Sequence, residues 1–167
     1  MTKENNIAFI DAQNLHLGTQ TENWKIDFKR FRIYLKDKFK INEAYFFLWF
    51  VDDEYQTMYR KIQKAGFILE FRKHNSSMKW KKKWNVDVDI VYDIMHRLLE
   101  EDDFDKIVLV SWDGDYIKLV KYLIKKNRLK KILFPNKKYS SLYKPLQNQF
   151  WMNISQERVK NRIKFEK

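Results

Sequence analysis

Two short apolar runs, about a hundred residues apart, each lead directly into an acidic segment. The first covers residues 7–10 and is followed by Asp11, and the second covers residues 107–110 and is followed by Ser111, Trp112 and Asp113. Short runs of apolar, mostly β-branched residues are typical of strands buried on both faces of a parallel sheet. Open parallel sheets bind their ligands beyond the carboxyl ends of the strands. The two runs therefore predict an α/β fold with acids at its ligand-binding edge.

Apolar runs alternate with helical patterns along the rest of the chain. The patterns predict strands over residues 7–10, 44–51, 67–71, 106–111 and 131–134, and helices over 27–39, 53–65, 86–101 and 115–127, with another after Ser141. This alternation predicts one three-layer domain, in which a central parallel sheet of about five strands, in the order 3-2-1-4-5, carries helices on both faces. A length of 167 residues fits one such domain. We expect residues 157–167 to form a charged C-terminal tail.

This strand order brings several acids towards one crevice. Strands one and four become neighbours, so Asp11 and Asp113 are expected to face the same switch point of the sheet. In the predicted helix 86–101, residues 88, 91, 94, 95 and 98 form an apolar face, and Asp87 lies on its edge. A carboxylate that faces the core is unfavourable unless it has a partner or binds a metal. The alternative is that Asp87 only interacts with the positive end of the helix dipole. Asp115 begins the next predicted helix and is either a fourth acid of the site or a capping residue.

The acids stand out because the chain is strongly basic. Lys and Arg number 34 against 22 Asp and Glu, which gives a net charge of +12. Residues 72–83 and 116–156 contain basic side chains and no acid. Such blocks attract polyanions, although lysines that merely keep helices solvated are the alternative. Converging carboxylates in a chain without cysteine favour Mg²⁺ or Mn²⁺ over zinc, and such an ion suits hydrolysis of a phosphodiester.

Three segments resemble motifs of the NYN domain family, which is part of the PIN-like nuclease superfamily. Residues 10–15 (IDAQNL) are similar to the family's IDGQNL opening, residues 83–89 (KWNVDVD) to its K-G-V-D-V-D segment, and residues 108–116 (VLVSWDGDY) to its V-L-V-S-G-D-G-D-F segment. Each motif alone is weak, but the three occur in the family's order and together are specific. Two departures are Trp112 and Asn85, which stand where the family has glycine.

The resemblance implies a PIN-like domain that cleaves RNA with Mg²⁺ or Mn²⁺. It implies Asp11, Asp87 and Asp113 as metal-binding acids, Asp115 as an assisting catalytic acid, and Asn14 as a residue that orients a metal ligand or phosphate. Basic and aromatic side chains before Asp87, and the indole beside Asp113, are candidates for holding the phosphate backbone and stacking on bases. These substrate-binding candidates are Lys79, Trp80, Lys81, Lys82, Lys83 and Trp112.

Two other functions are alternatives to a metal-dependent endoribonuclease. One is an RNA-binding or regulatory module that keeps the fold and has little or no turnover. The other is a phosphatase with an aspartyl nucleophile, but such an enzyme would have D-x-D at the first strand, and here Ala12 and Gln13 follow Asp11. We find no secretory signal and no apolar run near the ~20 residues that span a bilayer. We therefore expect a cytoplasmic protein that binds no membrane, with a second copy or a regulatory protein as a further possible partner.

Overall fold

The strands of the protein assemble into one parallel sheet. The structure is a computed structural model that describes residues 4–48, 53–72, 86–100 and 103–166. Within these residues the strands pair in the order β3-β2-β1-β4-β5-β6, and each neighbouring pair is parallel. Their bounds are Asn6–Asp11 (β1), Ile41–Leu48 (β2), Ile68–Phe71 (β3), Ile107–Val110 (β4), Leu129–Phe134 (β5) and Trp151–Asn153 (β6). The predicted order of five strands is confirmed, and the short edge strand β6 extends it.

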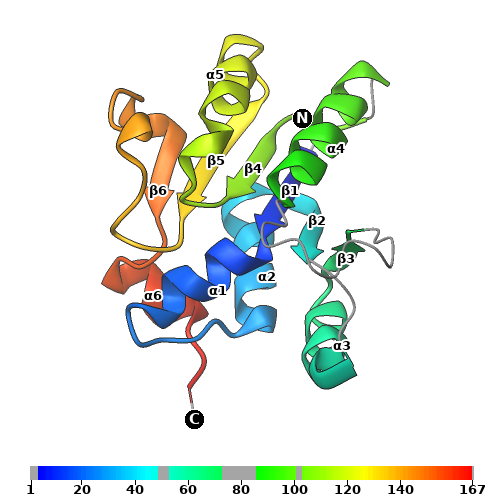
Figure 1. Ribbon diagram of the computed structural model, residues 1–167, viewed down its shortest axis with the longest axis vertical. Coiled ribbons are helices and arrows are strands. Elements are labelled where there is room, and N and C mark those ends of the chain that lie inside the picture. The colour runs from blue at the N-terminus through cyan, green and yellow to red at the C-terminus, as the bar shows by residue number, and fades with distance from the viewer. Residues whose placement is uncertain (1–3, 49–52, 73–85, 101–102, 167) are drawn as a thin grey trace, which may run out of the picture.

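Helices cover both faces of the sheet (Figure 1). They are Ala12–Gln20 (α1), Phe28–Phe39 (α2), Gln56–Lys64 (α3), Val86–Leu99 (α4), Ile117–Lys125 (α5) and Glu157–Ile163 (α6). Alternate residues of a strand point to opposite faces, and this separates the core into two clusters. Ala8 and Ile10 pack against α1, α2, α3 and α6, whereas Ile7 and Phe9 pack against α4 and α5. The predicted three-layer α/β domain is therefore confirmed.

Local signals account for several helix ends. The carboxylate of Asp27 accepts a hydrogen bond from the Arg30 backbone N–H (2.9 Å) and caps α2. Gly66 follows α3 with φ of 95°, a conformation that glycine adopts without strain. In the described part of the chain, no helix combines the length and the apolar character that crossing a membrane requires.

Three sequence-based expectations about helices are wrong. The segment after Ser141 forms the 3₁₀ turns Ser141–Tyr143 and Asn148–Phe150 rather than a helix. Pro145 has no backbone N–H, so it cannot donate the hydrogen bond that would continue the first turn as a helix. The expected C-terminal tail instead contains α6, whose Val159 and Ile163 are buried against the α2 side of the core. Val88 was placed on the buried face of α4 but is 61% exposed.

The helix α1 was not predicted because its sequence gives a weak signal. Its buried residues are Ala12, Leu15, Gly18 and Thr19, and only Leu15 is large and apolar. Small side chains suit this position because α1 lies close to the segment after β5. A Cβ added to Gly18 would lie 2.7 Å from the Pro135 Cβ. The close approach therefore requires glycine at this position, and the helix lacks an obvious amphipathic pattern.

Candidate metal centre at the carboxyl edge of the sheet

The central strands β1 and β4 bring the two acidic junctions together. Ile10 of β1 pairs with Val110 of β4, so Asp11 and Ser111 follow at the same level of neighbouring strands. Asp11 ends β1 and Asp113 lies in the turn that follows β4. The prediction that both acids lie at the switch point of the sheet agrees with this topology.

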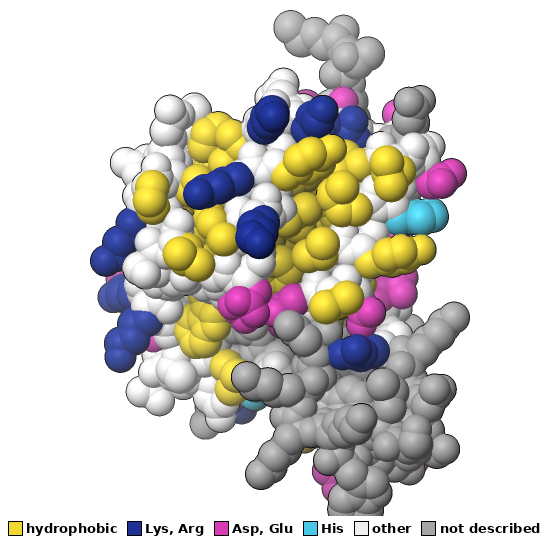
Figure 2. Space-filling view, turned by 45° about the horizontal axis from the view of Figure 1, so that its top comes forward, with side chains coloured by type: hydrophobic (Ala, Val, Ile, Leu, Met, Phe, Trp, Pro, Cys, Tyr) yellow, Lys and Arg dark blue, Asp and Glu magenta, His cyan; other side chains and the backbone are white. Residues whose placement is uncertain are grey.

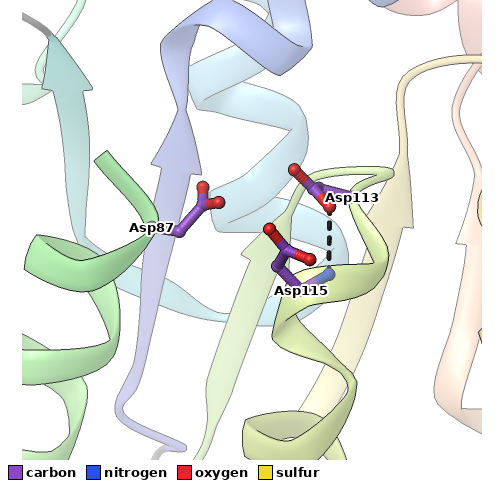
Figure 3. Close-up of side chains that lie close together, drawn as sticks. All are labelled: Asp87, Asp113 and Asp115. Carbon is purple, nitrogen blue, oxygen red and sulfur yellow. Dashed lines mark hydrogen bonds between the residues drawn. The ribbon is translucent and has the colours of Figure 1, made fainter. Parts of the chain in front are cut away.

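Each of these acids also caps the helix that follows it. The Asp11 carboxylate accepts a hydrogen bond from the Asn14 backbone N–H (3.0 Å) at the start of α1. The Asp113 carboxylate accepts one from the Asp115 backbone N–H (3.0 Å) in the 3₁₀ turn Gly114–Tyr116 before α5 (Figure 3). Capping at this second turn thus falls to Asp113 rather than to Asp115. Because a cap fixes the side-chain direction, these bonds aim both carboxylates at the edge of the sheet.

Three carboxylates converge at this edge from two elements (Figure 3). Asp87 lies in the first turn of α4, and Asp113 and Asp115 lie in the turn after β4. One oxygen from each lies within 4.8 Å of the others, and the residues range from buried Asp87 to exposed Asp115. Oxygen-only donors at this spacing fit a hard divalent cation such as Mg²⁺ or Mn²⁺, and partial exposure leaves room for its water ligands. The acidic cluster can therefore hold a divalent metal.

Asp11 adjoins this trio rather than forming part of it. Its side chain is 2% exposed, and the Tyr116 hydroxyl lies 3.2 Å from its Oδ2 and 2.7 Å from Asp87 Oδ1, donating towards both. Burial and the negative charge of Asp87 together raise the pKa of Asp11 to about 7, against the lowering effect of the Asn14 N–H. Burial and both carboxylates also raise the pKa of Tyr116 far above its usual range. Tyr116 therefore remains a phenol that joins the two acids.

A network of hydrogen bonds fixes the two junctions relative to each other. The Asn14 side-chain amide donates to Asp11 Oδ2 (3.0 Å), while its carbonyl accepts from the Ser111 hydroxyl (3.0 Å) and from the Trp112 backbone N–H (3.2 Å). Ser111 Oγ in turn accepts from the Asp113 backbone N–H (3.1 Å). Asn14 thus orients Asp11 and ties it to the turn that carries Asp113. The sequence predicts that Asn14 orients a metal ligand or phosphate, and that role remains a prediction.

A second layer holds the acidic turn from outside. The Tyr143 hydroxyl donates to the Asp113 carbonyl, and the Ser140 backbone N–H donates to the Trp112 carbonyl (3.2 Å). A Cβ at Gly114 would collide with the Ser140 hydroxyl, so this close packing requires glycine. The contacts of Ser111, Tyr116 and Tyr143 were not predicted from the sequence. The sequence does contain a signal for Tyr116: it stands where the family motif has phenylalanine, and the added hydroxyl indicates a hydrogen bond at the site.

The other candidate residues have different surroundings. The side chain of Trp112 packs half-buried against the core on the α4 and α5 side. Lys79, Trp80, Lys81, Lys82 and Lys83 lie outside the described residues, as does Asn85. Two further acids of α4 point elsewhere: Asp89 pairs with Arg72 (3.7 Å) and Asp93 with Arg97 (3.2 Å). Neither acid belongs to the trio of Asp87, Asp113 and Asp115.

A cleft of about 340 Å³ opens beside the acids. It is lined by Asp87, Val88, Val91 and Tyr92 of α4 and by Asp115 across from them. Figure 2 shows that hydrophobic and basic side chains lie next to acidic ones on this side of the molecule. Exposed lysines lie along α5 and directly after it: Lys118, Lys121, Lys125 and Lys126. The arrangement therefore combines a cation-binding edge with a neighbouring apolar cleft and a basic surround.

Comparisons with known proteins agree with this architecture. The chain is similar to the low amplitude and bright protein LabA of Synechococcus elongatus, with 26% identity over 124 residues; the match covers 69% of this chain and 65% of LabA. A crystal structure of a Vibrio parahaemolyticus protein of unknown function, VPA0982, superposes with a TM-score of 0.75 and 17% identity, covering 98% of this chain and 97% of that one. The NYN domain matches residues 6–150. The chain thus belongs to the NYN domain family, with a nuclease-like fold and an acidic cluster able to hold a metal.

Proposed function

We propose that this protein is a Mg²⁺- or Mn²⁺-dependent endoribonuclease that hydrolyses phosphodiester bonds in single-stranded or looped RNA. The observation that carries the proposal is the convergence of Asp87, Asp113 and Asp115 within 4.8 Å at the carboxyl edge of an NYN domain. A basic chain has little other reason to gather three acids at one point, because their mutual repulsion opposes the arrangement. A bound cation removes that repulsion.

The side chains would have two roles: some would bind the cation, and others would position those ligands. Asp87, Asp113 and Asp115 would bind the cation, which supplies a Lewis acid and a water of lowered pKa for attack on phosphorus. Asp11 would act on Asp87 through the hydroxyl of Tyr116, which contacts both carboxylates. Asn14 links Asp11 to the turn of Asp113. The sequence interpretation gave Asp11 a direct metal bond, whereas this geometry favours a supporting role.

RNA binding would rest on the basic surround. Exposed lysines of α5 and of the turn after β5, among them Lys118, Lys121 and Lys137, can neutralise phosphates next to the acids. Residues 79–83, which are also candidates for binding phosphates, lie shortly before Asp87 in the chain. The acids themselves repel phosphate, so productive binding at the edge should depend on the divalent cation.

Cleavage of end-labelled RNA with Mn²⁺, Mg²⁺ or chelator tests the proposal. Asp113→Asn keeps a capping side chain and Asp115→Asn changes an exposed one, so both variants should fold. At limiting Mn²⁺, each should cut at least about tenfold more slowly than the wild type, since each loses a charged ligand. Asp37→Asn, at an exposed position of α2, makes the same charge change away from the site and should cut normally.

The result also separates the enzyme from a binding module. Equal cutting by the wild type and both site variants would mean that the metal centre is not the source of activity. RNA binding with a steep dependence on salt, without cutting in either metal, would instead indicate an RNA-binding or regulatory module.

A further inference from the structure

The cleft beside the acids has a wall that metal binding alone does not explain. Along the outer face of α4, Val88 is 61% exposed and Tyr92 is 67% exposed. Both line the 340 Å³ cleft together with Val91, and Asp87 and Asp115 form its acidic end. Apolar surface gathered at a concave site is typical of binding sites. The exposed aromatic ring of Tyr92 next to a candidate metal centre therefore indicates that the cleft binds part of a ligand.

The geometry points to an unpaired nucleobase as that occupant: we propose that the cleft takes one base of single-stranded RNA, stacked on Tyr92, next to the phosphate that lies at the acids. This inference rests on the proposed function and assigns it a base-binding subsite. The volume of about 340 Å³ lies at the small end of ligand pockets, with room for one base and not for a paired helix.

The chemistry of the cleft selects a base over other parts of the substrate. A phosphate would meet the carboxylates of Asp87 and Asp115, whereas the face of a base is uncharged and apolar. The Tyr92 ring lies 5.7 Å from the His96 ring at an angle of 30°, so its neighbour restricts where it can turn. Aromatic stacking on bases tolerates any sequence and requires the bases to be unpaired. The subsite would therefore favour single strands over duplexes.

Charge and position favour RNA over a protein partner on this surface. The cleft is continuous with the acidic trio, since Asp87 and Asp115 belong to both. Basic side chains lie on the same face of the molecule as the hydrophobic ones that border the acids (Figure 2). A nucleotide chain satisfies both features at once, with its phosphates on the basic side chains and one base against α4. A second copy of this chain, itself strongly basic, would bring like charges together.

Binding of single-stranded RNA that carries 2-aminopurine tests the subsite. Tyr92→Ala should weaken RNA binding in Mn²⁺ about tenfold, measured from the rapid fluorescence change that precedes cleavage, and should raise the KM for cleavage by a similar factor. It should also reduce the size of the 2-aminopurine fluorescence change. Tyr92→Phe keeps the ring and should bind within about twofold of the wild type. Leu99→Ala alters another exposed apolar residue of α4, which does not line the cleft, and should change nothing. On a duplex of the same sequence, Tyr92→Ala should make no difference.

The possible failures are distinguishable. Wild-type binding by Tyr92→Ala, or equal weakening by Leu99→Ala, overturns the subsite while cleavage still supports the nuclease. Binding that depends on Tyr92 without any cleavage supports the subsite and overturns the nuclease. A change of particle mass in sedimentation for Tyr92→Ala, with unchanged RNA binding, would assign the face to a second copy and overturn the subsite. If the wild type neither binds nor cuts RNA, both proposals fail.

Discussion

Replacement of Asp11 by asparagine should change how the stability of the metal-free protein depends on pH. Asp11 is 2% exposed, and burial raises its pKa from 3.8 to about 7. A carboxyl with a raised pKa binds its proton more tightly in the folded protein than in the unfolded chain. Its contribution to stability is therefore fully present below the unfolded pKa and is lost as the pH rises through the folded value. Asparagine at this position does not titrate and lacks this dependence.

The magnitude follows from the size of the shift. A pH of about 5.5 lies roughly 1.5 units below the folded pKa, and each unit corresponds to about 1.4 kcal/mol. Protonation of Asp11 therefore adds about 2 kcal/mol to the free energy of unfolding at about pH 5.5, compared with about pH 8. The free energy of unfolding of the wild type minus that of Asp11→Asn should therefore rise by about 2 kcal/mol as the pH falls from about 8 to about 5.5. Taking this difference cancels the titration of the other groups.

Urea unfolding in chelator, followed by tryptophan fluorescence at several pH values, measures the difference. Asp37→Asn provides the control, because Asp37 is exposed on α2 and its replacement should leave the pH dependence unchanged. A difference between the wild type and Asp11→Asn that stays flat across this range, or that falls as the pH falls, refutes the reasoning. Such a result would mean that Asp11 is ionised near neutral pH in the folded protein despite its burial and its charged neighbour.

Three further substitutions test the supports of the fold and the site by urea unfolding. Tyr116→Phe should destabilise the metal-free protein by about 1–3 kcal/mol, because the buried carboxylates lose their shared donor; unchanged stability would mean that Asp87 is satisfied without it. Gly18→Ala should cost about 1–3 kcal/mol, since its Cβ would lie 2.7 Å from the Pro135 side chain, and a neutral effect would show that the segment after β5 yields easily. Ile163→Ala should cost about 2–5 kcal/mol if α6 belongs to the folded core, and almost nothing if the charged end frays.

The sheet was predictable because strand periodicity and acid position depend on local sequence. The runs before Asp11 and Asp113 could be recognised from four residues each, and strand order then followed from a common topology. Helix phase correctly turned Asp87 towards the core. The buried face of α4 is nevertheless rotated from the predicted one, because Val88 is exposed and Ile90 is buried. A phase estimated from apolar residues alone fails where an apolar side chain is kept on the surface.

The details of the site were less predictable because they depend on contacts between distant segments. The choice of Asp115 over Asp11 as the third member of the cluster depends on the 3₁₀ turn that follows Asp113, which periodicity does not reveal. The position of the Tyr116 hydroxyl between Asp11 and Asp87 brings together three separate elements. In both cases the residues were visible in the sequence, and only the packing determined their partners.

The same substitution should therefore have opposite consequences at two acids of one edge. At Asp11 both oxygens already accept hydrogen bonds and the side chain is buried, so its negative charge is unfavourable to folding near neutral pH. At Asp115 the side chain is exposed, and its charge adds little to the free energy of unfolding but attracts a cation. Asp115→Asn should thus weaken Mn²⁺ binding with little change in stability, whereas Asp11→Asn should relieve an unfavourable charge and affect Mn²⁺ binding less. Calorimetric titration of Mn²⁺ at about pH 8 measures both variants, and a larger loss of Mn²⁺ binding in Asp11→Asn would make Asp11 a direct ligand.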